Sequence, residues 1–125
     1  MSDKLILRGS EDTPEINFDR SENVFSISGR SYPENPREFY KPVVDWLTNY
    51  SESPNPSTML VVDLEYVNSG SVKEVFKMLY LVEDIMESGV EASIRWCYRN
   101  GDELMQQKGM EFKKFLQVPV ELEER

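Results

Sequence analysis

The sequence of 125 residues contains no histidine and a single cysteine, Cys97. The absence of histidine removes the most common general base, the most common zinc ligand and every Ser–His or Cys–His nucleophile pair. One cysteine excludes an intramolecular disulfide and a cysteine-based metal site, and it suits a reducing cytoplasm. We therefore expect a cytoplasmic protein with no metal and no cofactor, which catalyses no reaction.

The chain also lacks a long hydrophobic segment and an excess of positive charge. No run approaches the length of a membrane span, and the first apolar run, Leu5–Leu7, is too short for a signal peptide. Acidic residues number 23 against 14 basic ones, which gives a formal net charge of −9. Because the resulting field repels nucleic acid and anionic lipid, we expect neither a nucleic acid nor a membrane as a partner.

The hydrophobic pattern predicts an α/β fold in one domain, residues 1–125. The expected strands lie at residues 5–8, 15–18, 24–28, 58–67, 90–98 and 118–122, and the first three form a small antiparallel start. The expected helices begin after a cap at Asn35, near residue 72 and near residue 102. Strict alternation in 90–98 leaves one face of that strand polar, which predicts a mixed sheet with helices mainly on one face.

The junction between the central strand and its helix is the most informative stretch of the sequence. It reads Tyr66-Val67-Asn68-Ser69-Gly70-Ser71-Val72-Lys73. The first N–H groups of a helix lack internal partners and favour an anion, and Lys73 adds a full charge one turn into the helix. We therefore predict Ser69 as a phosphorylation site, with Asn68, Gly70, Ser71 and Lys73 around the phosphate.

Ser71 also has a structural interpretation. Together with Glu74, three residues later, it has the pattern of a capping box, and Gly70 would permit the tight turn before it. This interpretation makes Ser71 the N-cap of a helix that starts near Val72, and it leaves Ser69 outside the cap, exposed to a modifying enzyme. Both serines are candidates for the modification at this point.

The aromatic residues mostly occupy periodic positions, which favours the core for these side chains. Tyr32 is the exception, because it lies in a proline-bounded loop where it suits either a protein contact or a structural lid. Arg30, just before it, is interpreted either as a phosphate ligand or as an ion-pair partner of Glu34. The periodic positions are Tyr40, Trp46, Tyr66, Trp96 and Tyr98.

Several motifs together resemble the SiaC family of regulatory phosphoproteins. The first is Ile27-Ser28-Gly29-Arg30-Ser31-Tyr32-Pro33-Glu34-Asn35-Pro36, followed by Phe39-Tyr40-x-Pro42 and Trp46-Leu47. The second is the junction after Glu65, which usually reads Tyr-Phe-Asn-Thr-Ser-Ser-Ser-Lys in that family and is phosphorylated on its threonine. Ser69 occupies the threonine position and keeps the hydroxyl, while Val67, Gly70 and Val72 depart from the pattern.

The resemblance implies a STAS-like fold and a partner-switching role. It implies that a Ser/Thr kinase and a PP2C-like phosphatase set the phosphorylation state of Ser69. The unphosphorylated form would bind and activate a diguanylate cyclase, and thereby promote cyclic di-GMP synthesis and the formation of biofilm. The candidate partner-binding residues are Arg30, Tyr32, Glu34 and Asn35.

Two other classes of function remain at this point. A STAS-like antagonist of an anti-sigma factor would use the same phosphorylated turn to control transcription. A small enzyme would use Asp63 and Glu65, two carboxylates that lie two residues apart on one strand. The second class has the weaker basis, because this carboxylate pair has no partner base or defined pocket.

Overall fold

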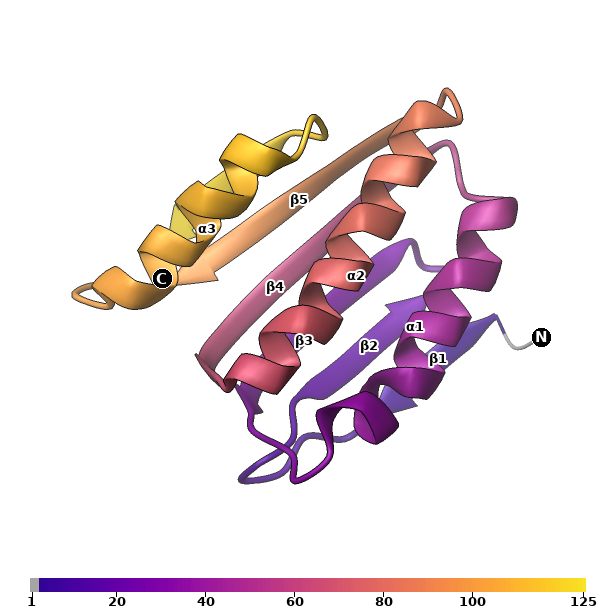
Figure 1. Cartoon of the computed structure of the whole chain (residues 1–125). Coiled ribbons are helices and arrows are strands. Elements are labelled where there is room, and N and C mark those ends of the chain that lie inside the picture. Colours follow the sequence, from indigo (N-terminus) through magenta and orange to yellow (C-terminus); the bar gives the residue numbers. More distant parts are fainter. Residues whose placement is uncertain (1–2) are drawn as a thin grey trace.

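A computed structural model describes residues 3–125, which form one mixed sheet and a layer of helices (Figure 1). The strands are β1 (Lys4–Leu7), β2 (Glu15–Asp19), β3 (Val24–Ser31), β4 (Ser57–Val67), β5 (Glu91–Tyr98) and β6 (Val120–Glu124). The helices are α1 (Pro36–Glu52), α2 (Ser69–Glu87) and α3 (Glu103–Phe115). This architecture confirms the predicted α/β class.

The six strands follow one another across the sheet in chain order, from β1 to β6. The pairs β1–β2 and β2–β3 are antiparallel, whereas β3, β4, β5 and β6 run parallel to one another. This arrangement confirms the antiparallel start and the central position of the 58–67 segment.

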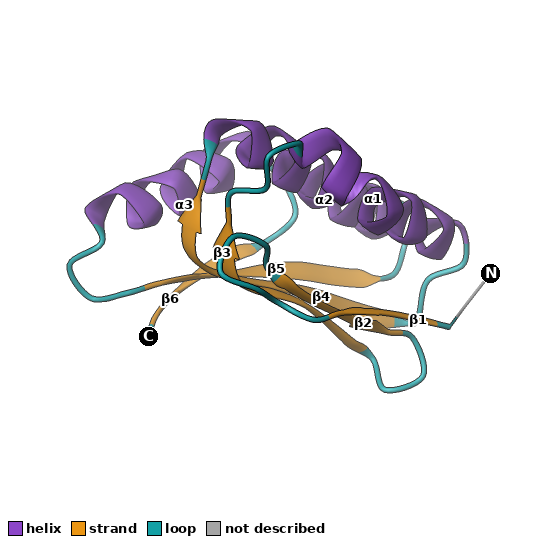
Figure 2. Ribbon diagram, turned by 90° about the horizontal axis from the view of Figure 1, so that it is seen from below, coloured by secondary structure: helices purple, strands orange, loops and turns teal. Residues whose placement is uncertain are grey.

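All three helices cover the same face of the sheet (Figure 2). Each helix connects two neighbouring parallel strands, and each connection moves in the same direction across the sheet. Because such crossovers are right-handed, successive crossovers in one direction place their helices on one face. Within residues 3–125, the opposite face of the sheet therefore carries no helix.

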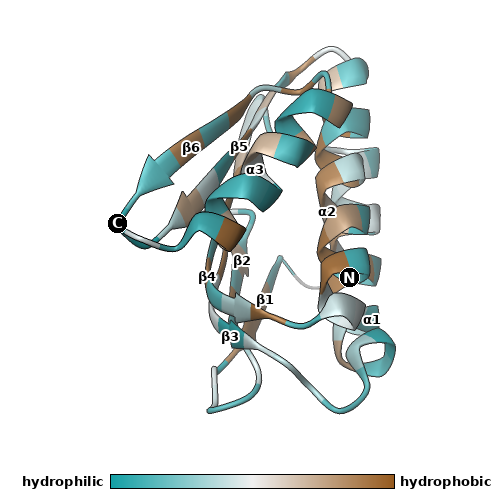
Figure 3. Ribbon diagram, turned by 60° about the vertical axis from the view of Figure 1, so that its left-hand side comes forward, coloured by the Kyte–Doolittle hydropathy of each residue, from teal (hydrophilic) through white to brown (hydrophobic). Residues whose placement is uncertain are grey.

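The core lies between the sheet and the helices. Figure 3 shows the hydrophobic residues of α2 on the side that faces the sheet. Trp96 of β5 is almost fully buried and donates its indole N–H to the backbone oxygen of Met105 in α3, at 2.9 Å. Gly109 of α3 lies directly against this ring, since a Cβ atom there would come within 2.5 Å of Trp96 Cδ1. This contact fixes α3 close to β5.

The last strand begins later than predicted, at Val120 rather than at residue 118. The cause is Glu83, the one polar residue on the apolar stripe of α2. Its carboxylate accepts the backbone N–H groups of Gln117 and Val118, the latter at 3.0 Å. These two donors are therefore bound to a side chain, and the ladder of β6 starts after them.

Candidate functional site

Three helices begin at one edge of the sheet. Because β3, β4 and β5 are parallel, their carboxyl ends lie at the same edge, and each is followed by a helix that a polar side chain caps. Asn35 accepts the N–H of Glu38 at 3.1 Å, Asn68 that of Ser71 at 2.9 Å, and Asp102 that of Met105 at 3.1 Å. Ligands of open α/β sheets generally bind outside the carboxyl ends of the strands, so this edge is the candidate site.

The turn between β4 and α2 differs from the predicted capping box. Asn68 is the N-cap and α2 begins at Ser69, so the predicted cap at Ser71 and the predicted start near Val72 are wrong. The backbone N–H of Asn68 donates to the carbonyl of Ser31 at 2.9 Å, which continues the pairing of β3 with β4 up to the cap. The helix therefore starts directly after Asn68, a residue type that caps as well as serine does. Glu74 pairs with Lys77 instead, at 3.0 Å.

The two candidate serines have opposite environments. Ser69 is the first residue of α2 and is exposed, and Lys73 lies exposed one turn further on the same side of the helix. Ser71 is fully buried beside Tyr40, a residue whose hydroxyl shares a 2.6 Å hydrogen bond with that of Ser31. A modifying enzyme therefore has access to Ser69 and not to Ser71.

The turn packs against the loop that follows β3. The side-chain amide of Asn68 donates to the carbonyl of Pro33 at 3.5 Å. Gly70 faces the ring of Pro36, where a Cβ atom would approach Cγ to 2.9 Å, so a glycine allows this close contact. Glu34 and Asn35 are both exposed in the same loop. The structure thus brings the predicted partner-binding loop and the predicted phosphorylation turn together.

Arg30 contacts two tyrosines rather than Glu34. Its guanidinium lies 5.2 Å from the ring centroid of Tyr32 and 5.8 Å from that of Tyr66, and the two rings meet edge to face at 5.4 Å. Tyr32 is 36% and Tyr66 46% exposed, so the prediction of Tyr66 as a core residue is wrong. We call Arg30, Tyr32 and Tyr66 the aromatic cluster.

A β-bulge creates the aromatic cluster. Gly29 pairs with Leu64 but Arg30 pairs with Tyr66, so Glu65 is an extra residue in β4. The insertion places Tyr66 on the same side of the sheet as Arg30. Ser31 points toward α1, where it binds Tyr40, and the preceding Arg30 therefore points to the face that has no helices.

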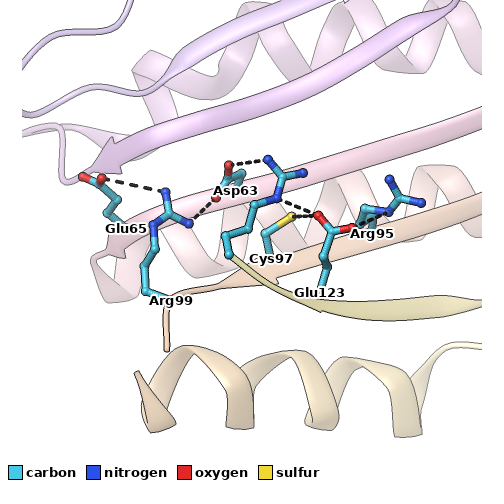
Figure 4. A network of polar contacts seen from close by, with 7 residues as sticks. Asp63, Glu65, Arg95, Cys97, Arg99 and Glu123 are labelled. Carbon is cyan, nitrogen blue, oxygen red and sulfur yellow. Dashed lines mark hydrogen bonds and ion pairs between the residues drawn. The ribbon is translucent and has the colours of Figure 1, made fainter. Parts of the chain in front are cut away.

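Asp63 and Glu65 belong to an ion-pair network on that same face (Figure 4). Asp63 accepts from Arg99 at 2.6 Å and from Arg125 at 3.3 Å, and Glu65 lies 3.8 Å from Arg99. Both carboxylate oxygens of Asp63 are therefore engaged by guanidinium groups and are not free to contact a substrate. The geometry therefore gives no support to the hypothesis of a catalytic carboxylate pair.

The first turn of α3 also belongs to this edge, although the sequence pattern did not predict it. Leu104 is 75% exposed, and it lies off the buried face formed by Met105, Gly109 and Phe112. That buried set recurs at a spacing of four and three residues, and Leu104 does not share it. A large apolar residue next to a helix cap and outside the periodic stripe was the available signal.

These features define the protein as a small α/β domain that presents an exposed hydroxyl at a helix N-terminus, a position that favours an anion such as a phosphate. The model of the SiaC family of regulatory phosphoproteins matches residues 7–125. The chain therefore belongs to the SiaC family. An uncharacterized protein of Pseudomonas aeruginosa (strain UCBPP-PA14) is 31% identical over 123 residues, which cover 98% of this chain and 97% of that protein.

Solved structures agree with this assignment. SiaC of Pseudomonas aeruginosa is 29% identical, with a TM-score of 0.88 over 100% of both chains. The crystal structure of the diguanylate cyclase SiaD in complex with its activator SiaC, also from Pseudomonas aeruginosa, contains a chain that is 29% identical. That chain gives a TM-score of 0.89, over 97% of this protein and 99% of its own length.

Proposed function

We propose that this protein is a non-catalytic regulator whose unphosphorylated form binds and activates a diguanylate cyclase. The observation that carries the proposal is the likeness, over nearly the whole chain, to a SiaC that was crystallised with the cyclase it activates. Activation raises the synthesis of cyclic di-GMP, and phosphorylation of Ser69 by a Ser/Thr kinase opposes it. A PP2C-like phosphatase restores the active form.

The position of Ser69 supplies the physical basis of the switch. A phosphate adds about 1.5 to 2 negative charges and three acceptor oxygens. At Ser69 it lies at the positive end of α2 and within reach of Lys73, so the modified state is stabilised inside this protein. The phosphate is strongly hydrated, and burial of it against a partner without a new cation costs several kcal/mol.

A titration of the purified cyclase with the unmodified and with the phosphorylated protein tests the proposal. We expect phosphorylation to weaken binding by about a hundredfold or more, and to abolish the increase in cyclic di-GMP production. Ser69→Ala is the matched control, since it removes only the hydroxyl and should bind and activate after incubation with kinase. Equal affinity and equal activation in both states would contradict the switch.

Non-catalytic action has its own test. No group of three or more metal-ligating side chains occurs within residues 3–125, and the carboxylate of Asp63 is held in ion pairs with Arg99 and Arg125. The purified protein without the cyclase should produce no cyclic di-GMP from GTP. Production of cyclic di-GMP by this chain alone would contradict the proposal.

No helix in the described part of the chain has the length and hydrophobicity needed to cross a membrane.

A further inference from the structure

A small pocket lies between the end of β4 and the first turn of α3. Its volume is about 140 Å³, and Tyr66, Val67, Leu104, Met105 and Lys108 contribute to its lining. A cavity of about 150 Å³ holds a group of the size of benzene, so this pocket fits one apolar side chain. Leu104 is 75% exposed at its rim, although a leucine gains free energy when it is buried.

The pocket is continuous with the surface that surrounds Ser69. Tyr66 lines the pocket and also belongs to the aromatic cluster, through its edge-to-face contact with Tyr32. Val67, a second lining residue, precedes the cap of α2 by one position. A partner that covers Ser69 and the aromatic cluster therefore reaches the pocket without crossing another element.

The charges at this surface select the chemistry of the partner. Glu65 pairs with Arg99, and Asp102 accepts the N–H of Met105, so both acidic side chains in the lining are engaged. Lys108 has no acidic partner within residues 3–125, and Arg30 lies over aromatic rings. These two cations carry local positive charge without a carboxylate partner, although the whole chain has a net charge of −9, and this local charge fits an acidic partner segment.

We propose that this pocket receives an apolar side chain from an acidic segment of the diguanylate cyclase. The binding surface then extends from Ser69 across Tyr66 to Leu104 and Lys108 in the first turns of α3. This inference rests on the proposed function and adds to it the place and the chemistry of the contact. Leu104 supplies apolar area at the rim, and Lys108 attracts the acidic residues beside the inserted side chain.

The test compares two pairs of variants of α3 in titrations with the purified cyclase. Leu104→Ser removes the apolar rim, and Phe115→Ser is its control, because Phe115 is 71% exposed at the other end of the same helix. Lys108→Glu reverses the charge at the pocket, and Lys114→Glu does so in the last turn. We expect each pocket variant to bind about tenfold more weakly or worse, and each control to bind within about twofold of wild type.

The outcomes separate the two proposals. If the wild type binds the cyclase and both pocket variants bind equally well, the pocket proposal is overturned and the proposed function stands. If the wild type fails to bind, both are overturned. A loss with Leu104→Ser but not with Lys108→Glu would overturn the acidic character of the segment. The loss with Lys108→Glu should also shrink at high salt, because salt screens exposed charges.

A photo-crosslink locates the contact independently. A benzophenone side chain at position 104 should label a cyclase peptide that carries Asp or Glu beside an apolar residue. The same group at position 115 should label no cyclase peptide. A labelled peptide without acidic residues, or equal labelling from both positions, would overturn the proposal.

Discussion

Ser69 and Ser71 are only two positions apart, but they differ completely in their accessibility to a kinase. Ser69 is the exposed first residue of α2, whereas Ser71 is fully buried beneath it. Burial of a phosphate in place of the Ser71 hydroxyl would displace Tyr40 and desolvate about two charges. The folded protein therefore offers a kinase a single hydroxyl in this turn.

Peptide mass spectrometry checks the assignment of the modified residue. After incubation of the folded protein with its kinase, we expect one phosphate in the turn, on Ser69. Ser69→Ala should lose this phosphate, whereas Ser71→Ala should keep it. Phosphate on Ser71 with Ser69→Ala still fully modified would contradict the assignment.

The buried side chain of Tyr40 stabilises the same turn between β4 and α2. Its hydroxyl shares a 2.6 Å hydrogen bond with Ser31, and burial raises the pKa of Tyr40 from 10.0 to about 12. Because the folded-state pKa is the higher one, the protonated tyrosine stabilises the fold fully below pH 10. That contribution is lost as the pH rises toward 12.

The variant Tyr40→Phe tests this pH dependence. At pH 7 we expect it to lower the free energy of unfolding by about 1 to 2 kcal/mol, since Ser31 loses its partner. Between pH 9 and 12 the stability of the wild type should fall about 2 to 3 kcal/mol further than that of the variant. Urea unfolding across this range measures both quantities, and parallel pH profiles of the two proteins would contradict the raised pKa.

The position of α3 depends on one residue without a side chain. Gly109 is buried against Trp96, and a Cβ atom would come within 2.5 Å of Cδ1 and 3.0 Å of Cγ and Nε1. The ring itself is fixed by its hydrogen bond to Met105. A methyl group at position 109 would therefore force α3 away from β5 or shift the indole ring.

We therefore expect Gly109→Ala to destabilise the protein by about 1 to 3 kcal/mol, despite the higher helix propensity of alanine. Urea unfolding measures the change. Gln107→Ala, at an exposed position of the same helix, is the control and should stay within about 0.5 kcal/mol of wild type. A more stable Gly109→Ala protein would show that the helix accommodates the methyl group.

The one-sided placement of the helices leaves the other face of the sheet to be covered by side chains. The ion pairs among Asp63, Arg99, Arg125 and Glu123 extend over this face at its carboxyl edge. Cys97 lies beneath them with no exposed surface, and burial raises the pKa of its thiol. The polar network therefore takes the place of a second helical layer at this point.

The reaction rate of the Cys97 thiol therefore measures how well the ion-pair network covers this face of the sheet. In the native wild type we expect slow reaction with a thiol reagent, because a buried thiol with a raised pKa forms little accessible thiolate. Arg125→Ala removes a side chain that pairs with both Asp63 and Glu123, and it should speed the reaction at least about tenfold. Lys41→Ala, in an exposed pair on α1, is the control and should leave the rate unchanged.

The sequence by itself determined the class of the fold and the order of the elements, and it predicted Ser69 as the site of the proposed switch. Hydrophobic periods, caps and turn residues are local signals, and they predicted every helix and strand to within a few residues. They also predicted helices on one side, because the alternation in β5 reports how each of its faces is covered.

Tertiary structure alone decided which side chains meet at the edge. The bulge at Glu65 turns Tyr66 outward, and the pairing of Asn68 with Ser31 moves the helix start to Ser69. The packing of α1 against the same turn buries Ser71. Each outcome depends on register between segments more than 30 positions apart in the sequence, and register is set by the global packing of the sheet rather than by local preference.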